Sequence, residues 1–152
     1  SFKASPLPKE MGILIMKISQ KQLSALVKAS KKASKNSYSP YSKKKIGAAL
    51  LLENKQIVTG CNIENASYGG TVCAERVALW KSLSENPKAQ VTVVAVFSNE
   101  QKPLSPCGMC RQVMIEFCDV KTRIHLVNKS GIQKTFTLGE LLPEAFNTSD
   151  LL

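Results

Sequence analysis

The sequence lacks any long apolar run. Its apolar N-terminal stretch, residues 11–16, is too short to span a membrane. A signal peptide would need a longer apolar core followed by small residues at a cleavage site. We therefore expect no membrane partner and a cytoplasmic location. Repeats and linker-like segments are also absent, so we predict one domain over residues 19–152, preceded by an N-terminal extension over residues 1–18.

Histidine, arginine and aromatic residues are scarce. The single histidine, His125, lies in an apolar run and is expected to be a strand residue, not a metal ligand. The net charge is +10, and seven lysines between residues 28 and 45 could attract nucleic acid. Only three of the 21 basic residues are arginine, and no aromatic residues alternate with the lysines to stack on bases. We interpret the lysines as a solvated helix face, which makes nucleic acid an unexpected partner.

Cysteine is the residue type that carries chemical information. There are five, an odd number, and three of them lie in the motifs Cys73-Ala74-Glu75 and Pro106-Cys107-Gly108-Met109-Cys110. This usage favours a reducing compartment over a disulfide framework. Three thiols can hold a zinc ion (Zn²⁺) and leave its fourth position to water, with Glu75 close enough to move protons. We predict one zinc per subunit on Cys73, Cys107 and Cys110.

The sequence around these thiols predicts that they lie at the starts of two helices. Cys107 and Cys110 are three residues apart, so they share one face if Cys107 opens a helix, and Pro106 favours such a start. An apolar stripe follows at Val113, Met114, Phe117 and Cys118. Cys73 heads a second helix with apolar residues at Val77, Trp80 and Leu83, ended by Asn86-Pro87.

The start of a helix favours thiolates, because its free N–H groups carry partial positive charge. Three thiolates around Zn²⁺ leave a net charge of −1, and we predict that Arg76 offsets it by hydrogen-bonding a cysteine sulfur. Beside this negative site the pKa of Glu75 should rise, which suits a group that accepts and donates protons. The alternative is a structural zinc knot with Cys61 as fourth ligand. Cys118 and His125 are the other spare donors, and a knot would explain neither Glu75 nor its spacing.

The motifs resemble those of the small homotetrameric zinc-dependent cytidine deaminases of pyrimidine salvage. The matching segments run from about Lys21 to the C-terminus: residues 38–42 (YSPYS), 47–49 (GAA), 60–68 (GCNIENASY), 73–76 (CAER), 105–112 (SPCGMCRQ) and 141–146 (LLPEAF). The resemblance implies hydrolytic deamination of cytidine and 2'-deoxycytidine to the uridines with release of ammonia. It also implies zinc on the three cysteines and Glu75 as the proton shuttle.

The same resemblance implies substrate contacts. Asn62 and Glu64 would hold the ribose 3'-hydroxyl, and the Ala74 N–H would meet the pyrimidine 2-oxo group. Ala66, Tyr68 and Phe146 would reach the pocket of a neighbouring subunit, so the active sites of the homotetramer would be shared. Without the resemblance, Asn62 and Glu64 form a polar turn after a strand, and Phe146 is an anchor for the C-terminal tail.

The sequence departs from the family pattern at Lys44, where the family has an aromatic residue near the pyrimidine. A lysine stem can cover a ring while its ammonium points outward, so Lys44 is a candidate substrate-binding residue. Alternatively, Lys44 meets an anionic group of another substrate, which would make the protein a deaminase of a modified or larger cytosine compound. A zinc-containing nucleic-acid-binding module is the alternative from a different class.

The remaining pattern indicates an α/β fold. A capping box, Ser19-x-x-Gln22, starts the first helix, and Thr137-x-x-Glu140 starts the last. Strands are predicted over residues 46–52, 56–61, 91–98, 122–128 and 133–137, with 91–98 central because it is the most apolar. Helices and strands alternate through the middle, which predicts a three-layer α/β/α arrangement with helices on both faces of a mixed five-stranded sheet.

Overall fold

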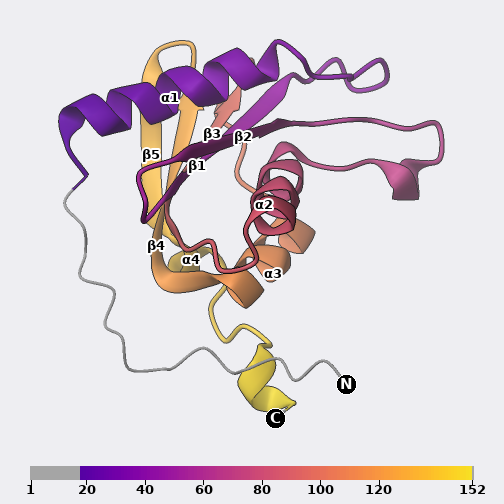
Figure 1. Ribbon diagram of the computed structural model, residues 1–152. Helices are drawn as coiled ribbons and strands as arrows, with labels where there is room; N and C mark the ends of the chain where they lie inside the picture. The colour runs from indigo at the N-terminus through magenta and orange to yellow at the C-terminus, as the bar shows by residue number, and fades with distance from the viewer. Residues whose placement is uncertain (1–17, 152) are drawn as a thin grey trace.

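A computed structural model describes residues 18–151 of the chain (Figure 1). The predicted extension, residues 1–18, therefore lies outside the described residues except for its last position. The elements follow one another in the predicted order: α1 (Gln20–Ser34), β1 (Ile46–Leu52), β2 (Ile57–Cys61), α2 (Ala74–Glu85), β3 (Val91–Ser98), α3 (Gly108–Phe117), β4 (Cys118–Asn128), β5 (Gly131–Thr137) and α4 (Leu138–Leu141). Short 3₁₀ turns occur at Tyr68–Gly70 and Thr148–Asp150.

The five strands form one mixed sheet in the order β2-β1-β3-β4-β5. Strands β3 and β4 are parallel and are joined through α3, whereas the other neighbouring pairs are antiparallel. The predicted mixed sheet with β3 at its centre is confirmed. Because β3 and β4 run in parallel, the connection through α3 starts at the carboxyl end of β3, where α/β folds commonly place their functional groups.

Helices cover both faces of the sheet, as Figure 1 shows. On one face, Leu26 of α1 packs against a cluster that includes Ala49, Val93 and Phe97. On the other face, α2, α3 and α4 bury a larger cluster that includes Leu79, Met114 and Leu138 with the opposite side chains of the same strands. The predicted three-layer α/β/α fold is confirmed, and alternate residues of the central strands face alternate layers.

Two glycines allow helices to approach the sheet closely. A Cβ atom on Gly47 would lie 2.0 Å from the carbonyl oxygen of Ser30 in α1. A Cβ atom on Gly60 would lie 2.6 Å from the carbonyl oxygen of Ala74 and 2.5 Å from the nitrogen of Ala78, both in α2. The backbone of β2 therefore fixes the position of the first turn of α2.

Several local predictions need correction. The stripe predicted on α2 is right only in part: Leu83 packs against the core and Val77 is half-buried, but Trp80 is 46% exposed, and the fully buried residues are Ala74, Glu75, Ala78, Leu79 and Ser82. On α3, Met114 is buried but Phe117 is exposed, and Cys118 begins β4 instead of ending the helix. Strand β4 thus starts four residues earlier than predicted. It follows α3 without a loop.

The helix ends agree with the sequence signals. Both predicted capping boxes are present, at Ser19 with Gln22 and at Thr137 with Glu140. Asn86 is the C-cap of α2, directly before Pro87. Within residues 18–151, no helix is long and apolar enough to cross a membrane.

Candidate active site

Three thiols converge where two helices begin. Cys73 is the N-cap of α2, Cys107 is the N-cap of α3, and Cys110 lies in the first turn of α3. Their sulfur atoms all lie within 4.8 Å of one another, and the Cys73 and Cys107 sulfurs are 3.8 Å apart. The prediction that both ligand groups sit at helix N-termini is confirmed. The free N–H groups of two helices thus face one cluster of sulfurs.

The electrostatics of the cluster favour a thiolate at Cys73. The Cys110 thiol donates a hydrogen bond to Cys73 and, with the Arg76 guanidinium, holds the pKa of Cys73 well below its usual range. The pKa of Cys110 is raised by the same hydrogen bond and by burial. A thiolate is the form that binds metal, and cation binding displaces the remaining thiol protons.

The donor set fits an open zinc site. Among residues 18–151, the group of potential ligands within reach of one ion consists of these three cysteines alone. Cys61 does not belong to it, and His125 lies in β4 with its Nδ1 atom 2.8 Å from the Thr135 hydroxyl. The four-ligand knot is therefore not formed by any of the spare donors. Three sulfur ligands with no fourth protein ligand are the pattern of a catalytic zinc site.

Glu75 lies directly beside the thiols and is shielded from solvent. It occupies the first turn of α2, two residues after Cys73, and only 4% of its surface is exposed. Burial raises the pKa of Glu75 to about 7, and the negative charge on Cys73 adds to the effect. The expected upward shift is present, with burial as its larger cause. A carboxyl group in this environment can hold a proton or release it near neutral pH.

Arg76 contacts the thiol cluster and residues of both helices that carry it. Its Nη2 atom lies 3.8 Å from the Cys73 sulfur, so the predicted hydrogen bond to a cysteine is present. Its Nη1 atom donates to the Met109 sulfur at 2.9 Å, and its guanidinium stacks on the Trp80 ring at 5.7 Å. Sequence reasoning missed Met109 and Trp80. A spacing of four residues between Arg76 and Trp80 on one helix was the available signal.

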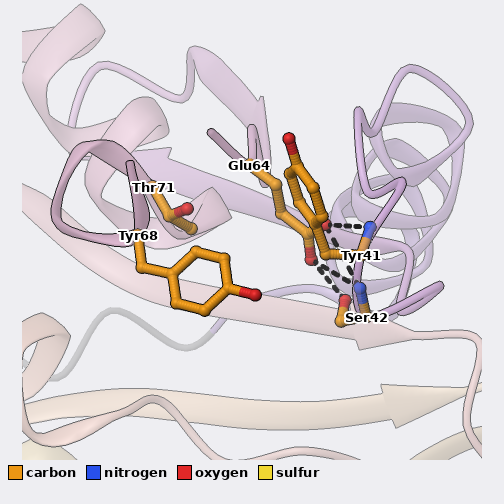
Figure 2. A pocket seen from close by; sticks show the side chains of 5 residues that line it. All are labelled: Tyr41, Ser42, Glu64, Tyr68 and Thr71. Carbon is orange, nitrogen blue, oxygen red and sulfur yellow. Dashed lines mark hydrogen bonds between the residues drawn. The ribbon is translucent and has the colours of Figure 1, made fainter. Parts of the chain in front are cut away.

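A cavity of about 430 Å³ lies between the loop before β1 and the segment between β2 and α2. Figure 2 shows its five lining residues: Tyr41, Ser42, Glu64, Tyr68 and Thr71. The rings of Tyr41 and Tyr68 meet edge to face, with their centroids 6.0 Å apart. Thr71 links the cavity to the thiols, because it lies two residues before Cys73 and its carbonyl oxygen accepts from Arg76 at 3.5 Å.

Glu64 forms the polar wall of this cavity. Its carboxylate accepts hydrogen bonds from the Tyr41 N–H at 2.9 Å, from the Ser42 N–H and from the Ser42 hydroxyl. These bonds, that from the Ser42 hydroxyl above all, lower the pKa of Glu64. The carboxylate is therefore held ionised and in place, with an orientation that the loop before β1 dictates.

Asn62 is anchored to the same loop. Its amide oxygen accepts from the Ile46 N–H at 2.9 Å and from the Ser37 hydroxyl, and its amide nitrogen donates to the Lys44 carbonyl at 2.9 Å. Asn62 is buried and is not among the residues that line the cavity. Both members of the predicted sugar-binding pair thus bind the loop that precedes β1, and only Glu64 also faces the cavity.

The other predicted contact residues are placed as follows. Ala74 is the first residue of α2 and is fully buried. Ala66 is exposed, Tyr68 is 76% exposed and Phe146 is 57% exposed. Phe146 is held by its backbone, since its carbonyl oxygen accepts from the Gln112 side chain at 2.8 Å. More than half of Phe146 is exposed, so its contact with a neighbouring subunit and its role as an anchor for the tail both stay predictions.

Lys44 has a partner that the sequence did not suggest. Its ammonium lies 3.4 Å from the Glu100 carboxylate, and Lys44 is not among the residues that line the cavity. The charge of Lys44 is therefore directed toward the segment after β3. A direct contact of Lys44 with the substrate stays a prediction.

Comparison with known proteins places the chain in a family. Residues 20–126 match the family described as the cytidine and deoxycytidylate deaminase zinc-binding region. The chain is 45% identical over 126 residues to the cytidine deaminase of Halalkalibacterium halodurans, covering 83% of this chain and 95% of that protein. It is also 45% identical over 126 residues to the cytidine deaminase of Sporosarcina psychrophila, covering 83% and 92%.

Solved structures agree with this assignment. The crystal structure of cytidine deaminase from Burkholderia pseudomallei superposes with a TM-score of 0.77 at 40% sequence identity, covering 85% of this chain and all of that chain. The fold and the three-thiol site define a zinc-binding deaminase domain. The chain belongs to the cytidine deaminase family.

Proposed function

We propose that this protein catalyses the hydrolytic deamination of cytidine and 2'-deoxycytidine to uridine and 2'-deoxyuridine. The observation that carries the proposal is the position of Glu75, which is buried two residues from Cys73; the described part of the chain adds no fourth protein ligand to the three thiols beside it. A purely structural metal site has no use for a carboxyl group that is buried beside it and is not a ligand. A hydrolytic site needs such a group to move protons.

The reaction adds water across the C4–N4 bond of the base. The water oxygen bonds to C4, the C4–N4 bond breaks, and the amino group leaves as ammonia. When bound by Cys73, Cys107 and Cys110, zinc supplies the Lewis acidity that makes water a nucleophile at neutral pH. Glu75 takes a proton from the attacking water and passes it to N3 of the ring; it then takes the second proton from the new C4 hydroxyl and gives it to the departing amine, which leaves C4 as a carbonyl. Arg76 offsets the negative charge of the thiolates through its contact with Cys73.

The cavity that Glu64 lines suits the sugar. The ionised Glu64 can accept a hydrogen bond from the ribose 3'-hydroxyl, and its ties to Tyr41 and Ser42 fix its position before substrate arrives. Asn62 supports that geometry through the same loop and is the second proposed 3'-hydroxyl contact. At the other end of the nucleoside, the Ala74 N–H at the start of α2 is proposed to meet the 2-oxo group of the pyrimidine.

The proposed assembly is a homotetramer with shared active sites. Ala66, Tyr68 and Phe146 would reach a neighbouring subunit, and their exposure within one chain supports this. Residues 19–152 would form the catalytic domain. A cytoplasmic role in salvage of free pyrimidine nucleosides fits five cysteines that are all free thiols. Light scattering coupled to gel filtration tests the assembly, and a monomer would contradict it.

The decisive experiment is a zinc-loaded turnover assay. Purified protein should bind one zinc per chain and cause loss of cytidine absorbance with release of ammonia in equal amount. Cytosine, 2'-deoxycytidine, dCMP and a cytosine-containing oligonucleotide form the comparison panel. Turnover of the oligonucleotide or of dCMP but not of the nucleosides would overturn the proposed substrate class. Stoichiometric zinc without turnover of any compound in the panel would overturn the enzyme assignment.

A further inference from the structure

We propose that Lys44 and Glu100 form an electrostatic clamp that holds the loop of the sugar cavity against the segment leading to Cys107. Lys44 would thereby be a positioning residue for nucleoside binding. This inference rests on the proposed function for its kinetic consequence, whereas the clamp itself is a property of the free protein.

The pair is unusual in its surroundings. The Lys44 ammonium and the Glu100 carboxylate are 3.4 Å apart, with 46% and 37% of their side chains exposed. It is the sole ion pair formed within residues 18–151, although the chain has 21 basic residues. No acidic residue occurs between Glu10 and Glu53. Lys43, Lys44 and Lys45 therefore repel one another in a segment that has no acidic residue of its own. Glu100, after β3, supplies the negative charge that Lys44 contacts.

On one side, the clamp is connected directly to the cavity. The Lys44 N–H donates to the Ser42 hydroxyl at 3.1 Å, and Ser42 in turn donates to the Glu64 carboxylate. The Lys44 carbonyl accepts from the Asn62 amide at 2.9 Å. Any displacement of Lys44 thus moves the groups that orient Glu64.

On the other side, the clamp is tied to the segment between β3 and α3. Two hydrogen bonds run alongside the ion pair: the Lys45 N–H donates to the Asn99 side chain at 2.7 Å, and the Asn99 N–H donates to the Lys45 carbonyl at 3.2 Å. Gln101, two residues after Asn99, is also held in place, because its carbonyl oxygen accepts a hydrogen bond from the Asn128 side chain of β4 at 2.6 Å. Glu100 is therefore presented by a segment that is hydrogen-bonded to both β4 and the loop before β1.

The loop depends on the ion pair because one of its residues adopts an unfavourable backbone conformation. Lys43 has a φ of 61°, in the left-handed region that residues other than glycine rarely adopt. The turn is closed by a bond from the Lys43 N–H to the Ser39 carbonyl at 3.1 Å. Releasing the ion pair lets the loop leave this conformation and take the cavity wall with it. Glu75 and the thiols lie on α2 and α3, which the core holds independently.

The test is a charge-swap cycle on the zinc-loaded protein. Lys44→Met and Glu100→Gln should each raise the KM for cytidine about twofold to fivefold, the range for a partly exposed ion pair, and leave kcat and zinc content unchanged. The double variant Lys44→Glu/Glu100→Lys should return KM to the wild-type value. Raising ionic strength from about 0.05 M to about 0.5 M should raise KM in the wild type and in the swap, but not in the neutral variants. Lys88→Met, at an exposed lysine after α2, is the matched control and should change nothing.

Amide hydrogen exchange gives a readout that does not require turnover. Exchange over residues 41–45 should speed up in both single variants and slow again in the swap. Wild-type KM values in both single variants, or a swap that restores neither KM nor protection, would overturn the clamp while leaving the deaminase assignment intact. A wild type that loads zinc but turns over no cytidine would overturn the proposed function, and hydrogen exchange would then still decide whether the clamp exists.

Discussion

The guanidinium of Arg76 lies over the ring of Trp80 at 5.7 Å from its centroid. The same guanidinium contacts the Cys73 sulfur. Arg76 therefore connects Trp80, the only tryptophan of the chain, to the metal site. We expect removal of zinc by a chelator to change the fluorescence of Trp80, because Arg76 responds to the charge on the thiolates. The change should be reversed by added zinc and should be titrated at the same zinc concentration as the recovery of bound metal. A variant with Arg76→Leu should show no zinc-dependent change, and a response that persists in that variant would contradict the coupling.

Arg76 itself should affect metal affinity. Its replacement by alanine removes the hydrogen bond to Cys73 and leaves the negative charge of three thiolates uncompensated, so we expect zinc affinity to fall about tenfold to a hundredfold. Arg76→Lys should bind zinc more tightly than Arg76→Ala but less tightly than the wild type, because one ammonium cannot contact Cys73, Met109 and Thr71 together. Competition with a chromogenic chelator measures the affinity. Arg123→Ala, in β4, is the control, and equal losses in both variants would point to a general charge effect.

Glu75→Gln separates metal binding from proton transfer. The glutamine preserves shape and is not a zinc ligand, so zinc content should stay at one per chain, while turnover should fall by about 10² to 10⁴, the range for loss of a general acid–base group. Glu85→Gln, at an exposed position of the same helix, should retain full activity. A Glu75→Gln protein with wild-type kcat would show that protons move by another route.

The helix starts, the pair Cys107 and Cys110, and the order of the elements could be predicted because each has a local signal, whereas the meeting of that pair with Cys73, 34 residues away, was expected from the resemblance to the deaminase motifs. The two capping boxes lie within four residues of sequence, and the spacing of Cys107 and Cys110 lets their sulfurs meet. The apolar run of β3 likewise marks a strand covered on both faces. These features depend on short-range chemistry, which a single sequence displays directly.

Features that depend on close approach or on distant partners could not be predicted. Helix α2 packs through Ala74, Ala78 and Ser82 because it lies directly against Gly60, and such small residues leave no hydrophobic stripe in the sequence. The stripe that the sequence does show includes Trp80, which is half exposed and stacks on Arg76. Likewise, the pairing of Lys44 with Glu100 joins loops that are distant in sequence, and no local pattern marks it.

The contact between Gly60 and α2 gives a final prediction that joins stability to the site. In Gly60→Ala, the new methyl group would lie 2.6 Å from the Ala74 carbonyl oxygen and 2.5 Å from the Ala78 nitrogen, and both are backbone atoms that cannot turn away. Helix α2 must therefore shift, at a cost of about 1–3 kcal/mol in the free energy of unfolding. Because Cys73 and Glu75 lie at the start of that helix, zinc affinity should fall as well. Urea unfolding and metal analysis measure the two effects. Gly69→Ala is the matched control, since a Cβ atom there would meet nothing within 4 Å. A Gly60→Ala protein that loses stability but binds zinc as tightly as the wild type would mean that the first turn of α2 keeps its position while the rest of the helix moves.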